Sequence, residues 1–382
     1  DTDRKAIQDE IDQLNTEIDR VAETTKFNEI YLLKGDDGEK TVNMKAHDAG
    51  LKGTLTDNGD GTATFKMDTL NAGDTVSIGG KNYTIGGEAA DVTDMLTKAG
   101  ITDAAGDKVT INGKEYTYCE NASDGKTALT HKGYYETAPD TANAATANPA
   151  YADSAAIAAA KSATISVGTK SITTIDDTKA DGIDDNDTSV ITKQKAYELA
   201  GKELLAANQI GDTEGNAEVK NGDKTDLAYN AGDGTFNIKV GQAKVANTLS
   251  FSLHVGADAD MTNKITVDIE TMNSANLGIK GLNVTDKNGS AATYAIDAIS
   301  DAISKVSSQR SALGAVQNRL EHTIDNLDNI SENTSSAESR IRDTDMAKEM
   351  VNYSKNNILA QAGQSMLAQA NQSNQGVLSL LQ

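Results

Sequence analysis

The sequence predicts an α+β protein in which helices from both chain ends form a long antiparallel bundle or coiled coil, with a β-hairpin-rich middle inserted between them. Three observations predict this class. Apolar residues recur at steps of three and four near both ends of the chain. The stretch 36–246 is rich in Gly, Asp, Thr and Asn and contains hairpin-like repeats. Aromatic residues make up only 4% of the 382 residues, which favours elongated helix seams and small β modules over one thick core.

The first expected element is an amphipathic helix from Asp3 to about Lys34, with Gly35 as its stop. Gln8, Asp9, Asp12, Asp19 and Arg20 fall on its other faces. Its apolar seam consists of Ile7, Ile11, Leu14, Ile18, Val21 and Thr25.

The middle region begins with an internal repeat, TVSIGGKNYTI at 75–85 and KVTINGKEYTY at 108–118. Each copy consists of two β-rich runs joined by Gly79-Gly80 or Asn112-Gly113, residues that tolerate the positive φ angles of a two-residue hairpin. The repeat places Ile78 and Ile111 in equivalent positions, as it does Tyr83 and Tyr116. A short helix, 91–98, is expected between the two hairpins.

Further elements are expected along the middle region. ISVGTKSIT at 165–173 resembles a degenerate third hairpin, and an Ala-rich helix is expected before it at about 153–163. Another helix is expected at about 192–208, followed by a strand at 235–240. We expect one or two small domains here.

The third block begins near Asn247 with a hairpin predicted from alternating apolar and polar residues. A very long helix follows from about Ala295, and RDTDMAKEM at 342–350 has the acidic first turn of a new helix. The expected domains are 1–35, 36–246, 247–342 and 343–382. The seam of the long helix consists of Ile296, Ile299, Ile303, Val306, Leu313, Leu320, Leu327, Ile330, Ala337 and Ile341.

The last residues, Asn356 to Gln382, contain no charged side chain but have a thin apolar stripe. Their hydropathy is too low, and too interrupted by Gln and Asn, for membrane insertion. An uncharged helix suits burial among many copies of itself, where stacked like charges would repel one another. An ordinary surface helix and a disordered polar tail remain alternatives on composition alone. The stripe consists of Leu359, Ala362, Met366, Ala370, Ser373, Val377 and Leu380.

Charge and motif content exclude several classes of function. A net charge of −22 without a basic cluster disfavours nucleic acid as a partner. Cys119 is the single cysteine, and no two of the four histidines are spaced for a zinc site. DNGDG at 57–61 and DGIDDND at 181–187 lack EF-hand spacing, so we interpret both as solvated turns. We expect no cofactor, no metal and no enzymatic activity.

Long motifs at both ends resemble bacterial flagellin. IQDEIDQLNTEIDRVAETTKFNEIYLLKG (7–35) resembles the second N-terminal helix of the family's core domain. LGAVQNRLEHTIDNL (313–327) and the segment 336–382 resemble its C-terminal end nearly position for position. The resemblance implies a self-assembling subunit of the extracellular flagellar filament, secreted without a cleaved signal peptide. Leu313, Leu320 and Leu327 would then pack against the seam from Ile7 to Val21.

The resemblance also implies partners: further copies of the chain, an export chaperone and the export apparatus, a filament cap protein, the hook–filament junction protein and host innate receptors. Glu10 matches a contact position for a cell-surface receptor. Leu359 and Met366 lie in the helix that lines the filament core. The C-terminal residues that match the region read by a cytosolic sensor are Val377, Leu378, Leu380 and Leu381.

One departure from the family is that about 100 residues, including the partner helix of the C-terminus, would precede Asp1. We therefore expect the chain starting at Asp1 not to polymerise, and Met346 to Gln382 to be largely disordered in isolation. Two alternatives remain for function: a hook–filament junction protein, or a filament-displayed adhesin that binds glycans through residues 36–246. In the second, Tyr83, Tyr116 and Tyr118 could form a sugar platform, although the sequence favours cross-strand packing as their use.

Overall fold

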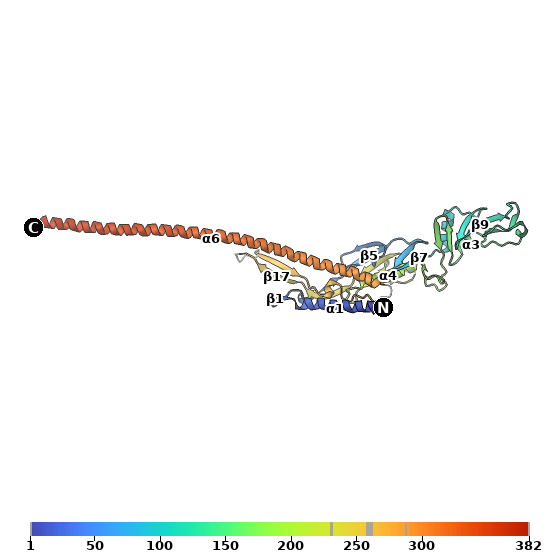
Figure 1. The fold of residues 1–382 in the computed structure, drawn as a ribbon, viewed down its shortest axis with the longest axis horizontal. Helices are drawn as coiled ribbons and strands as arrows, with labels where there is room; N and C mark the ends of the chain where they lie inside the picture. Colours follow the sequence, from blue (N-terminus) through green and yellow to red (C-terminus); the bar gives the residue numbers. More distant parts are fainter. Residues whose placement is uncertain (1, 230–231, 257–262, 287–288, 381–382) are drawn as a thin grey trace. The chain divides into compact units, whose positions relative to one another are not determined.

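The fold is described from a computed structural model, which describes residues 2–229, 232–256, 263–286 and 289–380. It combines helices and sheets, as the sequence predicts, and ends in one very long helix, α6 (Figure 1). The chain divides into two compact units. The first is Asp1–Leu249 with Asp268–Gln309, and the second is Ser250–Val267 with Arg310–Gln382.

The N-terminal helix α1 (Thr2–Thr24) is shorter than predicted. It is followed by a small hairpin of β1 (Lys26–Phe27) and β2 (Ile30–Tyr31). The turn residues Asn28 and Glu29 have φ angles of 47° and 68°, which an α-helix does not accommodate. The prediction of helix as far as Lys34 was therefore wrong.

One core of the first unit is built from strands that lie far apart in the sequence. A four-stranded sheet has the order β14-β15-β5-β4, and α4 (Lys193–Asn208) contacts two of its strands. Phe65 and Phe236 are fully buried at its centre, with ring centroids 6.4 Å apart. A separate pair joins β3 (Asp36–Asn43) to β16 (Gln242–Asn247). The sheet strands are β4 (Gly53–Asp57), β5 (Thr62–Met67), β14 (Glu218–Asn221) and β15 (Thr235–Lys239).

The repeated hairpins are confirmed. β6 (Thr75–Ile78) pairs with β7 (Lys81–Ile85) across Gly79-Gly80, and β8 (Lys108–Ile111) pairs with β9 (Lys114–Asn121) across Asn112-Gly113. All four turn residues have positive φ, as the two-residue turn requires. Ile78 and Ile111 are buried at equivalent positions, opposite Lys81 and Lys114. The helix between the hairpins is α2 (Ala89–Lys98), and β13 (Val190–Ile191) adds to β7 in parallel.

A second core forms around a five-stranded sheet of order β10-β9-β8-β11-β12. The predicted third hairpin is confirmed within it, because β11 and β12 pair antiparallel. The Ala-rich helix is shorter than predicted: α3 covers only Ser154–Ala158, and Ser162 has a φ of 47°. The other elements between residues 128 and 173 are β10 (Ala128–Tyr135), the 3₁₀ helix η1 (Thr141–Asn143), β11 (Thr164–Val167) and β12 (Lys170–Thr173).

The C-terminal block begins with the predicted hairpin, β17 (Leu249–His254) and β18 (Lys264–Ile269), whose connecting residues 257–262 lie outside the described chain. The short helix α5 (Ser274–Leu277) follows, and then α6 (Ser290–Leu380). The latter is continuous through 342–350, so the prediction of a new helix there was wrong. Acidic residues favour a helix start but do not interrupt a helix, and no Gly or Pro occurs in that segment. Residues 346–380 also belong to this helix, and their expected disorder in the isolated chain stays a prediction.

Candidate assembly surface

Polar side chains on one face of α1 bind the backbone of the segment 274–286. Gln8 bridges it twice, donating from Nε2 to the Leu282 carbonyl at 2.8 Å and accepting at Oε1 from the Val284 N–H at 2.9 Å. Asn15 Nδ2 donates to the Ile279 carbonyl at 3.2 Å. The helical pattern predicts Gln8 and Asp19 away from the packed seam, and this prediction was wrong. Gln8, Ile11, Asn15 and Asp19 follow one another at steps of three and four, so they lie on one face of α1, and this is the packed face.

The predicted apolar seam of α1 is consequently split. Ile11 and Ile18 are half-buried against a cluster that includes Leu277, Ile279 and Leu282. Thr25 is half-buried, and three further seam residues remain in solvent, with exposed fractions of 52% for Ile7, 56% for Leu14 and 40% for Val21. They recur at steps of seven and so form one stripe along the helix. We call Ile7, Leu14 and Val21 the α1 stripe.

Small residues attach the beginning of α6 to the same cluster. Ala295, Ala298 and Ala302 are buried, whereas Ile296 and Ile303 are 65% and 61% exposed. Alanine lets the helix approach closely, and the neighbouring isoleucines then remain outside the contact. The expected seam through these isoleucines therefore has no cover within the described part of the first unit.

Polar contacts fix this part of α6. The Tyr294 hydroxyl donates to Glu203 Oε2 of α4 at 2.6 Å, and Asp301 pairs with Lys45 at 2.9 Å. Lys305 Nζ donates to the Asn276 carbonyl at 2.7 Å, and burial lowers the pKa of this lysine. The start of α6 is thus bonded to three separate segments of the chain, and its later turns remain accessible.

The remainder of α6 carries large apolar side chains in solvent. The predicted residues Leu359, Met366 and Val377 are 58%, 73% and 57% exposed. The side chains of Leu378 and Leu380, and all of Leu381, lie outside the described residues. Apolar residues on further faces are also exposed, so the helix offers more than one contact face: Met346, Met350, Val351, Tyr353, Ile358 and Leu367.

The other predicted site residues lie in several different parts of the fold. Leu313, Leu320 and Leu327 are half-buried in the second unit, and their packing against α1 stays a prediction. Glu10 is exposed on α1. The three tyrosines do not gather: Tyr83 packs against the first core, whereas Tyr116 and Tyr118 stack edge-on against Tyr151 and Tyr134 in the second. The alternative of a tyrosine platform is therefore not supported, and Tyr118 makes the cross-strand contact with Tyr134 that the sequence favoured.

The acidic segment 181–187 is not simply a solvated turn, as the sequence suggested. Asp184 is only 2% exposed and accepts hydrogen bonds from the Ser162 hydroxyl and from three backbone N–H groups. Within the described ranges, no group of three or more His, Cys, Asp or Glu side chains could hold a metal ion. Among the described residues, none of the helices combines the length and the hydropathy that a membrane span needs.

Long helices with exposed apolar stripes are typical of proteins that associate with other chains by packing helix against helix. Comparison with known proteins agrees. The family profile described as "Bacterial flagellin C-terminal helical region" matches residues 296–381, and "Bacterial flagellin N-terminal helical region" matches residues 1–37. The chain is 54% identical over 134 residues to "Putative flagellin YvzB" of Bacillus subtilis (strain 168), covering 35% of this chain and 82% of that protein.

Two further relatives are longer. "Flagellin" of the same Bacillus subtilis strain is 50% identical over 169 residues, covering 39% of this chain and 54% of the relative. "Flagellar filament 33 kDa core protein" of Treponema phagedenis is 47% identical over 154 residues, covering 39% of this chain and 52% of the relative. The chain belongs to the bacterial flagellin family. It spans about half the length of these two relatives.

Proposed function

We propose that this chain is a structural subunit of the bacterial flagellar filament, acting outside the cell in motility and without enzymatic activity. The observation that carries the proposal is the exposed apolar surface of α6 from Met346 to Val377. Burying one such side chain contributes roughly 1.5–3 kcal/mol. A helix with this many free apolar residues is stabilised chiefly by packing against other helices.

Repetition converts this surface into a polymer. The part of α6 from Met346 to Val377 has exposed apolar residues on more than one face, so a contact between two of these faces joins unlike patches on successive copies. Such a heterologous contact that does not close into a ring generates an open helical polymer. The uncharged segment from Asn356 onward suits the centre of that polymer, because repeated copies bring no like charges together.

Within one subunit, we propose an antiparallel bundle in which Leu313, Leu320 and Leu327 pack against the seam from Ile7 to Val21. The heptad spacing of the leucines supports this arrangement. Family membership further supports an export chaperone and export apparatus, a cap protein, a junction protein and host innate receptors as partners. Glu10 and the C-terminal leucines are the residues proposed to meet those receptors.

The proposal is tested by growth from filament seeds. The N-terminal region of the Bacillus subtilis flagellin is fused before Asp1, and the product is added to sheared filaments of that flagellin. We expect the fusion to extend the seeds, and Met366→Asp to prevent extension by placing a charge in the packed stripe. Ser335→Asp, at an exposed position in the charged part of the same helix, is the control for adding one negative charge outside the uncharged segment. Electron microscopy of filament length gives the readout. Failure of the fusion to grow, or equal growth with Met366→Asp, would overturn the proposal.

A further inference from the structure

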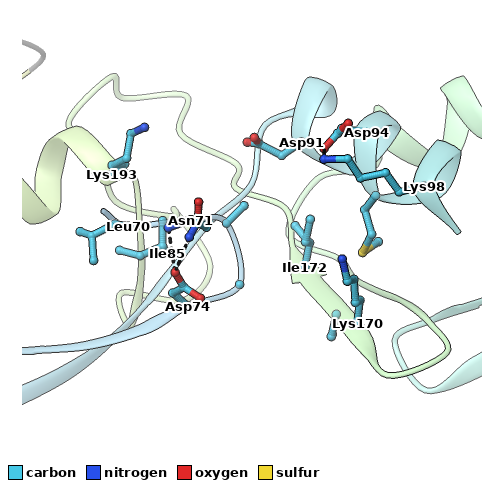
Figure 2. A pocket seen from close by; sticks show the side chains of 15 residues that line it. Leu70, Asn71, Asp74, Ile85, Asp91, Asp94, Lys98, Lys170, Ile172 and Lys193 are labelled. Carbon is cyan, nitrogen blue, oxygen red and sulfur yellow. Dashed lines mark hydrogen bonds and ion pairs between the residues drawn. The ribbon is translucent and has the colours of Figure 1, made fainter. Parts of the chain in front are cut away.

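A cleft lies in the first unit, where the first core meets the second. Its walls come from the turn 70–74, the end of β7, one face of α2, the strand β12 and the first residue of α4 (Figure 2). Its volume is about 490 Å³, within the range of about 300–1,000 Å³ usual for small-molecule sites. No residue of this junction cleft belongs to α1 or α6, the helices proposed for assembly.

Glycines fix the base of the junction cleft. Gly73 has a φ of 88°, and a Cβ there would lie 2.5 Å from the Ser171 carbonyl oxygen. A Cβ on Gly87 would lie 2.4 Å from Ile172 Cγ2. The Gly87 N–H donates to the Thr173 carbonyl at 2.8 Å, which joins the two backbones. The two segments therefore approach closely at the base of the cleft, and a side chain larger than that of glycine does not fit at positions 73 and 87.

The floor of the cleft is apolar and its rim is polar. Leu70, Ile85, Met95 and Ile172 are buried below it. The rim carries three carboxylates, from Asp74, Asp91 and Asp94, and three ammonium groups, from Lys98, Lys170 and Lys193. These charges sum to zero, so the rim favours neither an anion nor a cation, although the chain as a whole has a net charge of −22.

Three of the rim groups retain capacity for further hydrogen bonds, whereas Lys98 pairs with Asp94 at 2.6 Å and Asp91 accepts from the Glu88 N–H at 2.9 Å. Asp74 Oδ2 accepts from the Asn71 backbone and side-chain amides, at 2.8 and 3.2 Å, which leaves its other oxygen free for a ligand. Lys170 and Lys193 have no side-chain hydrogen bond or ion pair among the described residues, and Figure 2 shows them on opposite walls. Carboxylates accept and ammonium groups donate, so a ligand here must do both.

We infer that the junction cleft binds a short neutral oligosaccharide. Sugar hydroxyls both donate and accept, which matches the mixed rim, and the C–H faces of the rings match the apolar floor. The residues proposed to contact it are Asp74, Lys170 and Lys193. This site differs from the tyrosine platform considered from the sequence, and it would add carbohydrate binding to a filament subunit.

The test uses the full chain and saturation-transfer NMR with lactose, cellobiose, chitobiose and sialyllactose. We expect transfer to at least one neutral disaccharide, and binding at least tenfold weaker in Asp74→Asn/Lys170→Met. Lys126→Met, at an exposed turn of the second core, should bind as the unaltered chain does. No transfer from any neutral sugar, equal binding by cleft and control variants, or binding of sialyllactose alone would overturn the inference.

A second measurement needs no variant and covers the case in which the double variant fails to fold. Reductive methylation of the unaltered chain is followed by mass spectrometry with and without the bound disaccharide. We expect the sugar to slow modification of Lys170 and Lys193 at least threefold relative to Lys126. An equal effect of the sugar on the modification rates of all three lysines would contradict the site. Because the cleft lies outside α1 and α6, seed extension by Asp74→Asn/Lys170→Met separates this inference from the filament proposal.

Discussion

The carboxylate of Asp19 accepts two hydrogen bonds from Ser274, one from its backbone N–H at 2.7 Å and one from its hydroxyl at 2.9 Å. This pair ties α1 to the start of α5 across 255 residues of sequence. Together with Gln8 and Asn15, it determines which face of α1 is turned to the protein. The α1 stripe is left in solvent for that reason.

Removing this carboxylate should loosen α1. Asp19→Ala deletes two charge-assisted hydrogen bonds to a buried serine, and we expect a loss of about 1.5–3 kcal/mol in the free energy of unfolding. Asp9→Ala, on an exposed position of the same helix, should change it by less than about 0.5 kcal/mol. Urea denaturation measures both. Equal effects of the two substitutions would show that Asp19 does not anchor the helix.

The buried aromatic pair provides a second prediction. Phe236→Ala should lower the free energy of unfolding by about 3–5 kcal/mol, because it leaves a cavity beside Phe65 in the first core. Phe27→Ala is the matched control. Phe27 is 74% exposed in the β1–β2 hairpin, so its truncation should cost less than about 0.5 kcal/mol. Thermal unfolding of both variants tests this, and a mild effect at Phe236 would place the core elsewhere.

Acidification should affect the Asp184 site. Burial opposes ionisation of this carboxyl, but the hydrogen bonds from Ser162 and from backbone N–H groups outweigh it and lower its pKa. A carboxyl with a lowered folded pKa stabilises the fold above its unfolded pKa of about 3.9, and this stability is lost as the pH falls through the folded value.

Asp184→Asn should therefore cost about 1–3 kcal/mol at pH 7, and the difference from the unaltered chain should shrink below about pH 4. Asp68→Asn, on an exposed residue, serves as the control. Urea titrations at a series of pH values give the comparison. A deficit for Asp184→Asn that stays constant down to pH 2 would contradict the assignment.

The bundle proposed for α1 and α6 can be tested by a double-mutant cycle between Leu14 and Leu320. If the two side chains pack together, Leu14→Ala and Leu320→Ala should be non-additive by about 0.5–3 kcal/mol. Leu14 with Leu204, which is fully buried in the first core, forms the control cycle and should be additive. Additivity in both cycles would refute the seam contact.

Hydrogen exchange tests the C-terminal half of α6 in the monomer. Its side chains are exposed from Glu338 through Val377, and Gly363 and Gly376 each weaken a helix by about 1 kcal/mol relative to alanine. We expect amides between Leu359 and Val377 to exchange much faster than those of α4, which packs on a core. Strong protection in a monomer would mean that this helix is stable without partners.

Several features depend on local patterns and could be predicted from the residues alone. Gly79-Gly80 and Asn112-Gly113 specified two hairpins, because few residue pairs adopt positive φ twice in succession. The apolar spacing specified α4 and a long helix from about residue 295, although not its continuation through 342–350. The long motifs at both ends specified the family. These signals are contained within a few turns of chain, so no distant contact is needed to read them.

Which face of a helix is covered depends instead on contacts between distant parts of the chain. The seam of α1 satisfied the helical period, yet Ile11 and Ile18 are packed while Ile7, Leu14 and Val21 are exposed. The difference arises because side chains of α1 bind backbone groups more than 250 residues away, which no local pattern encodes. The junction cleft is of the same kind. Its rim combines residues of the turn at 70–74, α2, β12 and α4, and only the packing of the two cores brings their charges together.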